Sequence, residues 1–246
     1  MKIAGFVLLV VGLVCFGTGC VTPETATLLS QDDPIALVSV VSNWDINWKG
    51  EDPVNPRLIG SVARRALRAN RDMTLILNAE ELINTAERLF RESMAELNLV
   101  NLAEKETVLR SRAYQEAQLN KYQVNRGAVT PTDYRLVDFR YKRLPQALAA
   151  ETGIQRIMFL EFNFTKAMRS GFGKNGNGGA ELDMRVLILD SKGKTLYSKT
   201  FALGSRSTIG VSNGIYSRSG LTELFETAIG DICYEFLYHF EDALWF

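Results

Sequence analysis

The closing segment of the chain carries the pattern that most limits its fold. Between residues 221 and 240, apolar side chains recur at alternating spacings of three and four residues. These side chains are Leu221, Leu224, Phe225, Ala228, Ile229, Ile232, Cys233, Phe236, Leu237 and Phe240. The spacing predicts one long helix with a wide apolar stripe. A stripe of that width has to be buried against another layer of secondary structure.

The layer against this helix is predicted to be a sheet. Residues 35–41 form a short apolar run rich in β-branched side chains, which is typical of a central buried strand. Residues 156–164 and 182–189 predict two further strands. A turn at 190–193 joins the second of these to a strand over 194–203, so the sheet is expected to contain a hairpin.

Helical spacing also recurs earlier in the chain. Asn78, with Glu81 three residues later, resembles a capping box and opens a helix that reaches Leu97. Helices are also expected over 58–67, 105–119 and 145–151, short strands over 73–77 and 98–102, and loops over 42–56 and 120–132. Gly153 is expected to stop the helix before it. The order predicts an α/β fold: a single sandwich domain over residues 34–246, with helices packed on a mixed, partly antiparallel sheet.

The first twenty residues have the order of a lipoprotein signal. Lys2 precedes an apolar run of 14 residues, and Gly17-Thr18-Gly19-Cys20 follows it. The run is shorter than the roughly 20 residues that a membrane-spanning helix needs, which predicts a signal peptide over residues 1–19. Thr18 and Gly19 before Cys20 resemble a lipobox, so Cys20 is expected to be lipidated and to carry palmitate. Gly17 stands where that pattern usually has an aliphatic residue, and a plain cleaved signal or an uncleaved anchor are the alternatives.

A short tether is expected to join the anchor to the domain. Residues 20–33 are polar and rich in threonine, and they contain Pro23. The 13 residues after Cys20 reach at most about 43 Å when fully extended. The domain is therefore expected to stay close to a membrane of the bacterial envelope, facing the periplasm. The outer membrane is favoured over the inner one.

The charge balance excludes one broad class of partner. The chain has 28 basic and 28 acidic residues and no net charge. A nucleic-acid-binding protein normally has a clustered basic excess, so no nucleic-acid partner is expected. Hydrophobic residues make up 46% of the chain and charged residues 23%, which is typical of a globular domain.

The sequence shows no recognisable catalytic or metal-binding constellation. His239 is the sole histidine and lies near the end of the closing helix, whereas a general base needs a supporting cleft. Cys233 lies on the apolar face of that helix and is expected to be a core residue. The acidic residues of the helical segments are expected to lie on solvated faces as members of ion pairs; they include Glu80, Glu81, Glu87, Glu104 and Glu106.

A glycine-rich segment matches a nucleotide-binding pattern only in part. Residues 171–176 fit G-x-G-x-x-G and follow a predicted strand. A dinucleotide site needs a helix after the third glycine to hold the pyrophosphate, and a strand is predicted there instead. The segment is therefore expected to be a hairpin loop. Together, the missing nucleotide-binding helix and the missing catalytic and metal-binding constellations predict that the chain is not an enzyme and holds no cofactor or metal.

Aromatic residues mark two candidate interfaces. Trp44 and Trp48 lie in a polar loop, where large rings can bind a partner. The alternative is that both rings pack over the edge of the core, and we favour this alternative. Trp245 and Phe246 at the end of the chain raise the same question, because apolar termini either pack on the fold or bind a partner.

Several segments resemble the envelope lipoproteins grouped around the penicillin-binding-protein activator LpoB, the curli secretion protein CsgG and the N-terminal domain of TolB. The matching segments are the strand at 35–41, the helix-strand-helix start at 87–109, the alanine-rich helix, glycine and strand at 148–158, and the hairpin turn at 187–194. The resemblance implies a non-catalytic, protein-binding role in the envelope. The Trp-bearing and Gly-rich loops depart from the pattern, and no functional residue is carried over from it.

Two functions follow as expectations. The first is a lipid-anchored, non-enzymatic protein, held to the membrane through Cys20, that binds an envelope protein or supports envelope assembly. The alternative is a periplasm-facing receptor domain for a small molecule or lipid. A large apolar cavity with convergent polar groups would favour the receptor, whereas a filled core with an exposed aromatic patch would favour the protein-binding role.

Overall fold

A computed structural model describes residues 33–50, 77, 79–97, 100–172, 175–213 and 215–245. Its sheet contains the strands β1 (Ile35–Ser42), β2 (Arg156–Phe172), β3 (Asn175–Asp190), β4 (Thr195–Gly204), β5 (Ile209–Ser212) and β6 (Ile215–Tyr216). Their order is β1-β2-β3-β5-β6, and β4 also pairs with β3. The β1–β2 pair is parallel and the other pairs are antiparallel. This confirms the predicted α/β fold with a mixed sheet.

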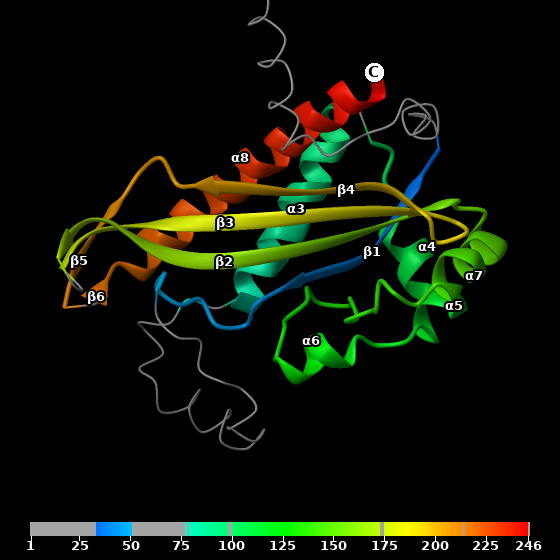
Figure 1. Cartoon of the computed structure of the whole chain (residues 1–246), viewed down its shortest axis with the longest axis horizontal. Coiled ribbons are helices and arrows are strands. Elements are labelled where there is room, and N and C mark those ends of the chain that lie inside the picture. Colours follow the sequence, from blue (N-terminus) through cyan, green and yellow to red (C-terminus); the bar gives the residue numbers. More distant parts are fainter. Residues whose placement is uncertain are drawn as a thin grey trace, which may run out of the picture.

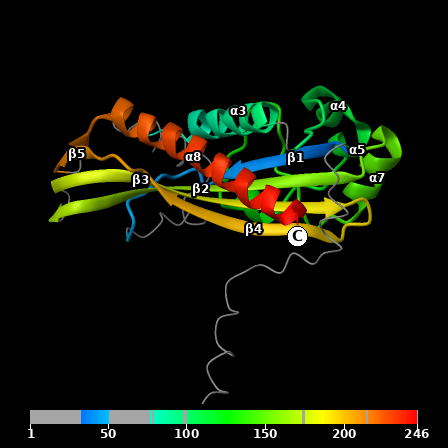
Figure 2. The same cartoon turned by 90° about the horizontal axis from the view of Figure 1, so that it is seen from above.

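The described helices form two groups. They are α3 (Ala79–Leu97), α4 (Lys105–Arg110), α5 (Arg112–Gln115), α6 (Lys121–Asn125), α7 (Arg143–Thr152) and α8 (Arg218–Trp245). The long helices α3 and α8 lie on one face of the sheet, and α4, α5 and α7 gather at one of its ends (Figures 1 and 2). The β2–β3 hairpin, with β5 and β6 beside it, forms the opposite end (Figure 1). None of the described helices is long and apolar enough to cross a bilayer.

The core lies between the sheet and the two long helices. Along β2, the side chains of Phe162 and Phe164 are buried while those of Glu161 and Asn163 are exposed, which is the alternation of a strand with one covered face. Phe164 packs edge-on against Phe225 of α8, with ring centroids 5.7 Å apart. The apolar stripe predicted for the closing helix therefore packs on the sheet, as expected.

The first strand is buried as predicted but is not central. All eight residues of β1 are buried, yet β1 lies at the end of the strand order. Its outer edge is partly covered by isolated bridges from Ile35 to Leu102 and from Ser42 to Val129. Every residue of β1 is thus buried although no full strand among the described residues pairs with its outer edge, because later loops cover that edge. The strand predicted over 98–102 is wrong, because in its described part only the single bridge at Leu102 forms.

Two polar side chains explain where the structure departs from the predictions for residues 105–132. Ser111 has an extended backbone, and its hydroxyl accepts a hydrogen bond from the Tyr114 amide, which ends α4 and begins α5. One helix over 105–119 is therefore replaced by two short ones. Asn120 caps α6 in the same way within the predicted loop, through the Tyr122 and Gln123 amides. The helix predicted over 58–67 lies outside the described residues, and so does the strand predicted over 73–77 apart from Leu77, which is in no strand.

Other predicted boundaries agree with the structure. Gly153 follows α7 with a left-handed backbone, φ 78°, and its amide bonds to the Ala149 carbonyl at 2.9 Å, so the glycine stop is confirmed. The hairpin joining β3 to β4 through residues 191–194 is also confirmed. Strands β2 and β3 are both longer than predicted, because their glycine- and asparagine-rich ends pair with each other beyond the apolar alternation.

Candidate functional site

The Trp-bearing loop, residues 43–50, continues the line of β1 along β2. The Lys49 amide donates to the Lys166 carbonyl at 2.7 Å, and the Lys166 amide donates to the Asn47 carbonyl at 2.9 Å. Trp48 and Lys166 form an isolated parallel bridge. The loop is therefore tied to the sheet by backbone hydrogen bonds, although its sequence has no strand pattern.

Asn43 connects this loop to β2 with its side chain. Its Oδ1 accepts from the Phe164 amide at 2.8 Å, and its Nδ2 donates to the Phe164 carbonyl at 2.9 Å. The same Nδ2 donates to the Asp45 carbonyl at 2.6 Å. The side-chain amide thus takes the place of a neighbouring backbone strand, and it satisfies both polar groups of a residue whose ring is in the core.

We expect Asn43→Ala to lower the free energy of unfolding by about 1–3 kcal/mol, because it leaves the Phe164 amide and carbonyl without these partners. Urea unfolding would measure the loss. The matched control is Asn163→Ala on the same strand, where the side chain is exposed and bonds to Asp183 at 3.3 Å. That control should change stability by less than about 0.5 kcal/mol. Equal losses for the two variants would contradict the role given to Asn43.

The Trp48 ring packs onto the hairpin end of the sheet. It meets the Tyr216 ring edge-on at 5.9 Å, and the Lys166 ammonium lies 5.4 Å from the centroid of each ring. A Cβ at Gly178 would come within 2.9 Å of the Trp48 ring, so a glycine is needed beneath it. Trp44 is also half-buried and packs against the core. This placement fits the edge-of-core alternative, and partner binding by these rings stays a prediction.

The other predicted site residues lie at or beyond the limits of the described residues. Trp245 is the last residue of α8, but its side chain is not among those described. Phe246 and the predicted lipidation site Cys20 lie outside the described residues altogether. The interface at Trp245 and Phe246 and the lipidation of Cys20 therefore stay predictions.

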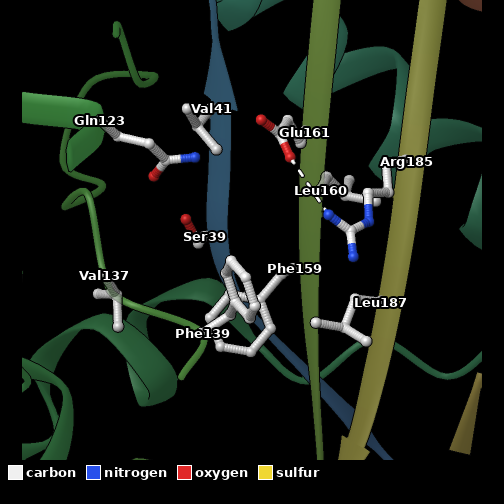
Figure 3. A pocket seen from close by; sticks show the side chains of 10 residues that line it. All are labelled: Ser39, Val41, Gln123, Val137, Phe139, Phe159, Leu160, Glu161, Arg185 and Leu187. Carbon is white, nitrogen blue, oxygen red and sulfur yellow. Dashed lines mark ion pairs between the residues drawn. The ribbon is translucent and has the colours of Figure 1, made fainter. Parts of the chain in front are cut away.

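A shallow hollow lies on the face of the sheet away from α3 and α8, between β1, β2 and β3 and the side chains of Gln123, Val137 and Phe139 (Figure 3). It is lined by Ser39, Val41, Gln123, Val137, Phe139, Phe159, Leu160, Glu161, Arg185 and Leu187. Phe139 packs edge-on against Phe159 at 6.4 Å, and the Arg185 guanidinium lies 5.8 Å from the Phe139 ring. The cavity volume is about 20 Å³, which admits a single water molecule. Ligand pockets have volumes of roughly 300–1,000 Å³, so this hollow does not fit a metabolite.

A buried charged cluster joins α3 to the loop before α7. Glu87 Oε1 accepts from Arg91 Nε at 2.6 Å and from the Tyr134 hydroxyl at 3.1 Å, and Lys105 Nζ lies 3.9 Å away. Arg91 also donates to the Tyr134 hydroxyl at 2.7 Å. Burial raises the pKa of Tyr134 above its ordinary value. The expectation that Glu87 lies on a solvated face is therefore wrong: it is 7% exposed and holds three segments together.

The residues capable of nucleophilic or acid–base chemistry lie apart. His239 is exposed on α8, with its ring centroid 5.7 Å from that of Phe201. Cys233 is fully buried, and desolvation raises the pKa of its thiol to about 12, so it is protonated and unreactive at neutral pH. In the part of the chain that the structure describes, no three His, Cys, Asp or Glu side chains gather as a metal site would require.

The glycine-rich segment is the tip of the β2–β3 hairpin. Gly171 pairs with Gly176, and both have positive φ values, 112° and 145°. A Cβ on Gly171 would lie 2.1 Å from the Asn175 carbonyl oxygen, so the two strands approach too closely for any side chain there. A strand follows the motif, as expected, and the helix of a dinucleotide site does not. Phe172, within the motif, is 93% exposed. Sequence reasoning missed this exposure, although a phenylalanine flanked by glycines in a hairpin was a visible signal.

No protein-family model matches the chain, and no curated protein matches it. Among solved structures, it is similar to the lipoprotein GNA1162 from Neisseria meningitidis, with 14% identity, 82% of this chain and 99% of that chain covered, and a TM-score of 0.27. It is also similar to the C-terminal domain of LpoB from Salmonella enterica, with 12% identity, 75% and 96% covered, and a TM-score of 0.19. The second protein belongs to the group that the sequence patterns resemble. At these TM-scores, neither similarity establishes a shared fold or function.

Proposed function

We propose that the chain is a lipid-anchored, non-enzymatic protein of the bacterial cell envelope that binds a partner protein on the periplasmic side. The observation that carries this proposal is the order of residues 1–20, a short apolar run that ends in Thr18-Gly19-Cys20. Acyl chains on Cys20 would hold the domain at a membrane, because each buried methylene contributes about 0.8 kcal/mol.

The described part of the domain supports a binding role over a catalytic one. The lone thiol is buried, the histidine is exposed and far along α8, and the hollow on the sheet holds only about 20 Å³. This hollow among the described residues therefore gives no support to the small-molecule receptor considered as the alternative.

The anchor is tested by mass spectrometry of the chain purified from its native membranes, together with labelling by an alkyne fatty acid. We expect the mature chain to begin at Cys20 with added acyl mass, and Cys20→Ser to lose the label completely. The matched control is Cys15→Ser, which removes the other leader thiol and should keep full labelling. A purified chain that begins at Met1, or Cys20 without acyl mass, would contradict the anchor.

The binding role needs a second measurement in the same membranes. Chemical crosslinking of the intact protein in its membranes, followed by affinity purification, should recover a defined protein partner. Recovery of a bound small molecule and no protein would instead support the receptor alternative. The crosslinking result identifies what the domain binds, whereas the anchor test reports acylation of Cys20, so the two proposals can fail separately.

A further inference from the structure

The hairpin end of the sheet presents an uncharged row of residues with two apolar side chains. Phe172 pairs with Asn175, and Ser212 pairs with Ile215 on the neighbouring hairpin. The two pairs are joined by the bond from the Asn213 amide to Asn175 Oδ1 at 2.8 Å. Phe172 is 93% exposed and Ile215 is 58% exposed. With strands about 4.8 Å apart, the two apolar side chains lie about 15 Å from each other.

The two hairpin segments behind this row contain no acidic residue of their own. Residues 162–180 and 202–222, which supply the hairpins, contain five Lys and Arg residues and no Asp or Glu, in a chain whose acidic and basic residues are equal in number. Three of these cations pair with carboxylates from outside the two hairpin segments: Arg169 with Glu181 at 3.3 Å, Arg206 with Asp231 at 3.5 Å and Arg218 with Glu81 at 3.2 Å. Because Phe172, Asn175, Ser212 and Ile215 carry no charge, this outermost row can approach a phospholipid surface without burying a charged side chain of its own.

The tether joins the domain at the opposite end. Ile35 pairs with Arg156, the first residue of β2, and Asp33 Oδ2 lies 2.9 Å from the Arg156 guanidinium. Phe172 is the last residue of that 17-residue strand, about 50 Å away. Figure 1 shows this separation, with β1 beginning near α4 and α7 and the β2–β3 tip at the far end. The tether reaches at most about 43 Å, which is less than this separation, so the tip can touch the bilayer that holds the anchor only if the strand axis is tilted away from the membrane normal.

From this placement we infer that the row formed by Phe172, Asn175, Ser212 and Ile215 is a second membrane contact, which rests on the phospholipid surface that holds the Cys20 anchor. The inference depends on the proposed anchor. Two side chains bind a free protein to a membrane only weakly. Once the chain is anchored, the same contact is intramolecular, with an effective concentration of about millimolar, and becomes populated. The strand axis of the domain is then tilted away from the membrane normal.

Depth-dependent fluorescence quenching tests this contact. The full-length lipoprotein with Ser212→Cys, labelled with an environment-sensitive dye, is reconstituted into phosphatidylcholine–phosphatidylglycerol vesicles that contain a spin-labelled lipid. We expect a blue-shifted emission and at least twofold quenching of the label. Phe172→Ala should remove more than half of that quenching. The matched control Tyr238→Ala removes another exposed aromatic ring, 74% exposed on α8, and should leave the quenching unchanged.

The other outcomes overturn either the contact or the anchor. An unquenched label on protein that floats with the vesicles, or equal quenching after Phe172→Ala, would overturn the membrane contact. A label that is shielded in native membranes but unquenched in pure lipid would overturn it too, and would assign the tip to a protein partner. Protein that does not float contradicts the anchor alone. The tip is then tested on the mature chain held by an amino-terminal histidine tag on nickel-chelating lipid, with the same readout.

Discussion

Phe236→Ala should lower the free energy of unfolding by about 3–5 kcal/mol, which is the range for removing a large buried aromatic side chain. Phe236 is fully buried on α8 and meets four other rings. Its centroid lies 5.7 Å from Phe90, 6.0 Å from Tyr197, 5.9 Å from Phe201 and 5.3 Å from Phe240. The substitution therefore leaves a cavity where α3, α8 and β4 meet, in a domain whose total stability is expected to be about 5–15 kcal/mol.

Urea unfolding followed by circular dichroism would measure this loss as a lower midpoint with an unchanged slope. Phe236→Leu should retain part of the stability, because it fills part of the cavity. Tyr238→Ala is the control on the same helix, since its ring is 74% exposed, and it should change stability by less than about 0.5 kcal/mol. Similar losses in Phe236→Ala and Tyr238→Ala would show that the ring cluster is not the centre of the core.

Glu87→Ala is expected to have the second-largest effect, a loss of roughly 2–3 kcal/mol. It removes the carboxylate that the Arg91 guanidinium and the Tyr134 hydroxyl share, and leaves a mostly buried cation without its partner. This expected loss lies at or below the low end of the range for breaking a buried ion pair, because the Arg91 side chain is still 21% exposed. Loosening of the α3 contact with the 100–135 region should accompany the loss, and hydrogen exchange of the Tyr134 segment would detect it.

The matched control for this prediction lies one turn away on α3. Glu92 pairs with Arg88 at 2.9 Å, and both side chains are more than half exposed, so Glu92→Ala should cost no more than about 0.5 kcal/mol. Glu87→Gln keeps a hydrogen-bond acceptor and should fall between the two alanine variants. If Glu87→Ala and Glu92→Ala were equally mild, the buried cluster would have no special role in stability.

Elements whose pattern is local could be predicted from the sequence. The stripe from Leu221 to Phe240 predicts α8, and the turn at 190–193 predicts the β3–β4 hairpin, because each depends on neighbours within a few residues. The break at Ser111 was missed because a serine can lie within a helix or cap a new one, and tertiary contacts decide between these two states.

Features that depend on distant contacts could not be predicted. Glu87 has an ordinary place on an amphipathic helix, and its burial follows from Tyr134, which is 47 residues away. The hydrogen bonds between the Trp-bearing loop and β2 also join residues far apart in the chain. No local sequence pattern therefore predicts them. The candidate rings Trp44 and Trp48 were found by residue type alone, whereas the exposed ring of Phe172 depends on the length of the paired strands.

The parallel pairing of β1 with β2 has a consequence for biogenesis. Asn43, just after β1, is 121 residues from Phe164, its partner on β2. Synthesis from the amino terminus produces β1 early, and this strand has no β2 partner until residues 156–172 have been made. Contacts of such long separation form late and slowly. During this interval the apolar segment is exposed, and chaperones or proteases can bind the unfinished chain.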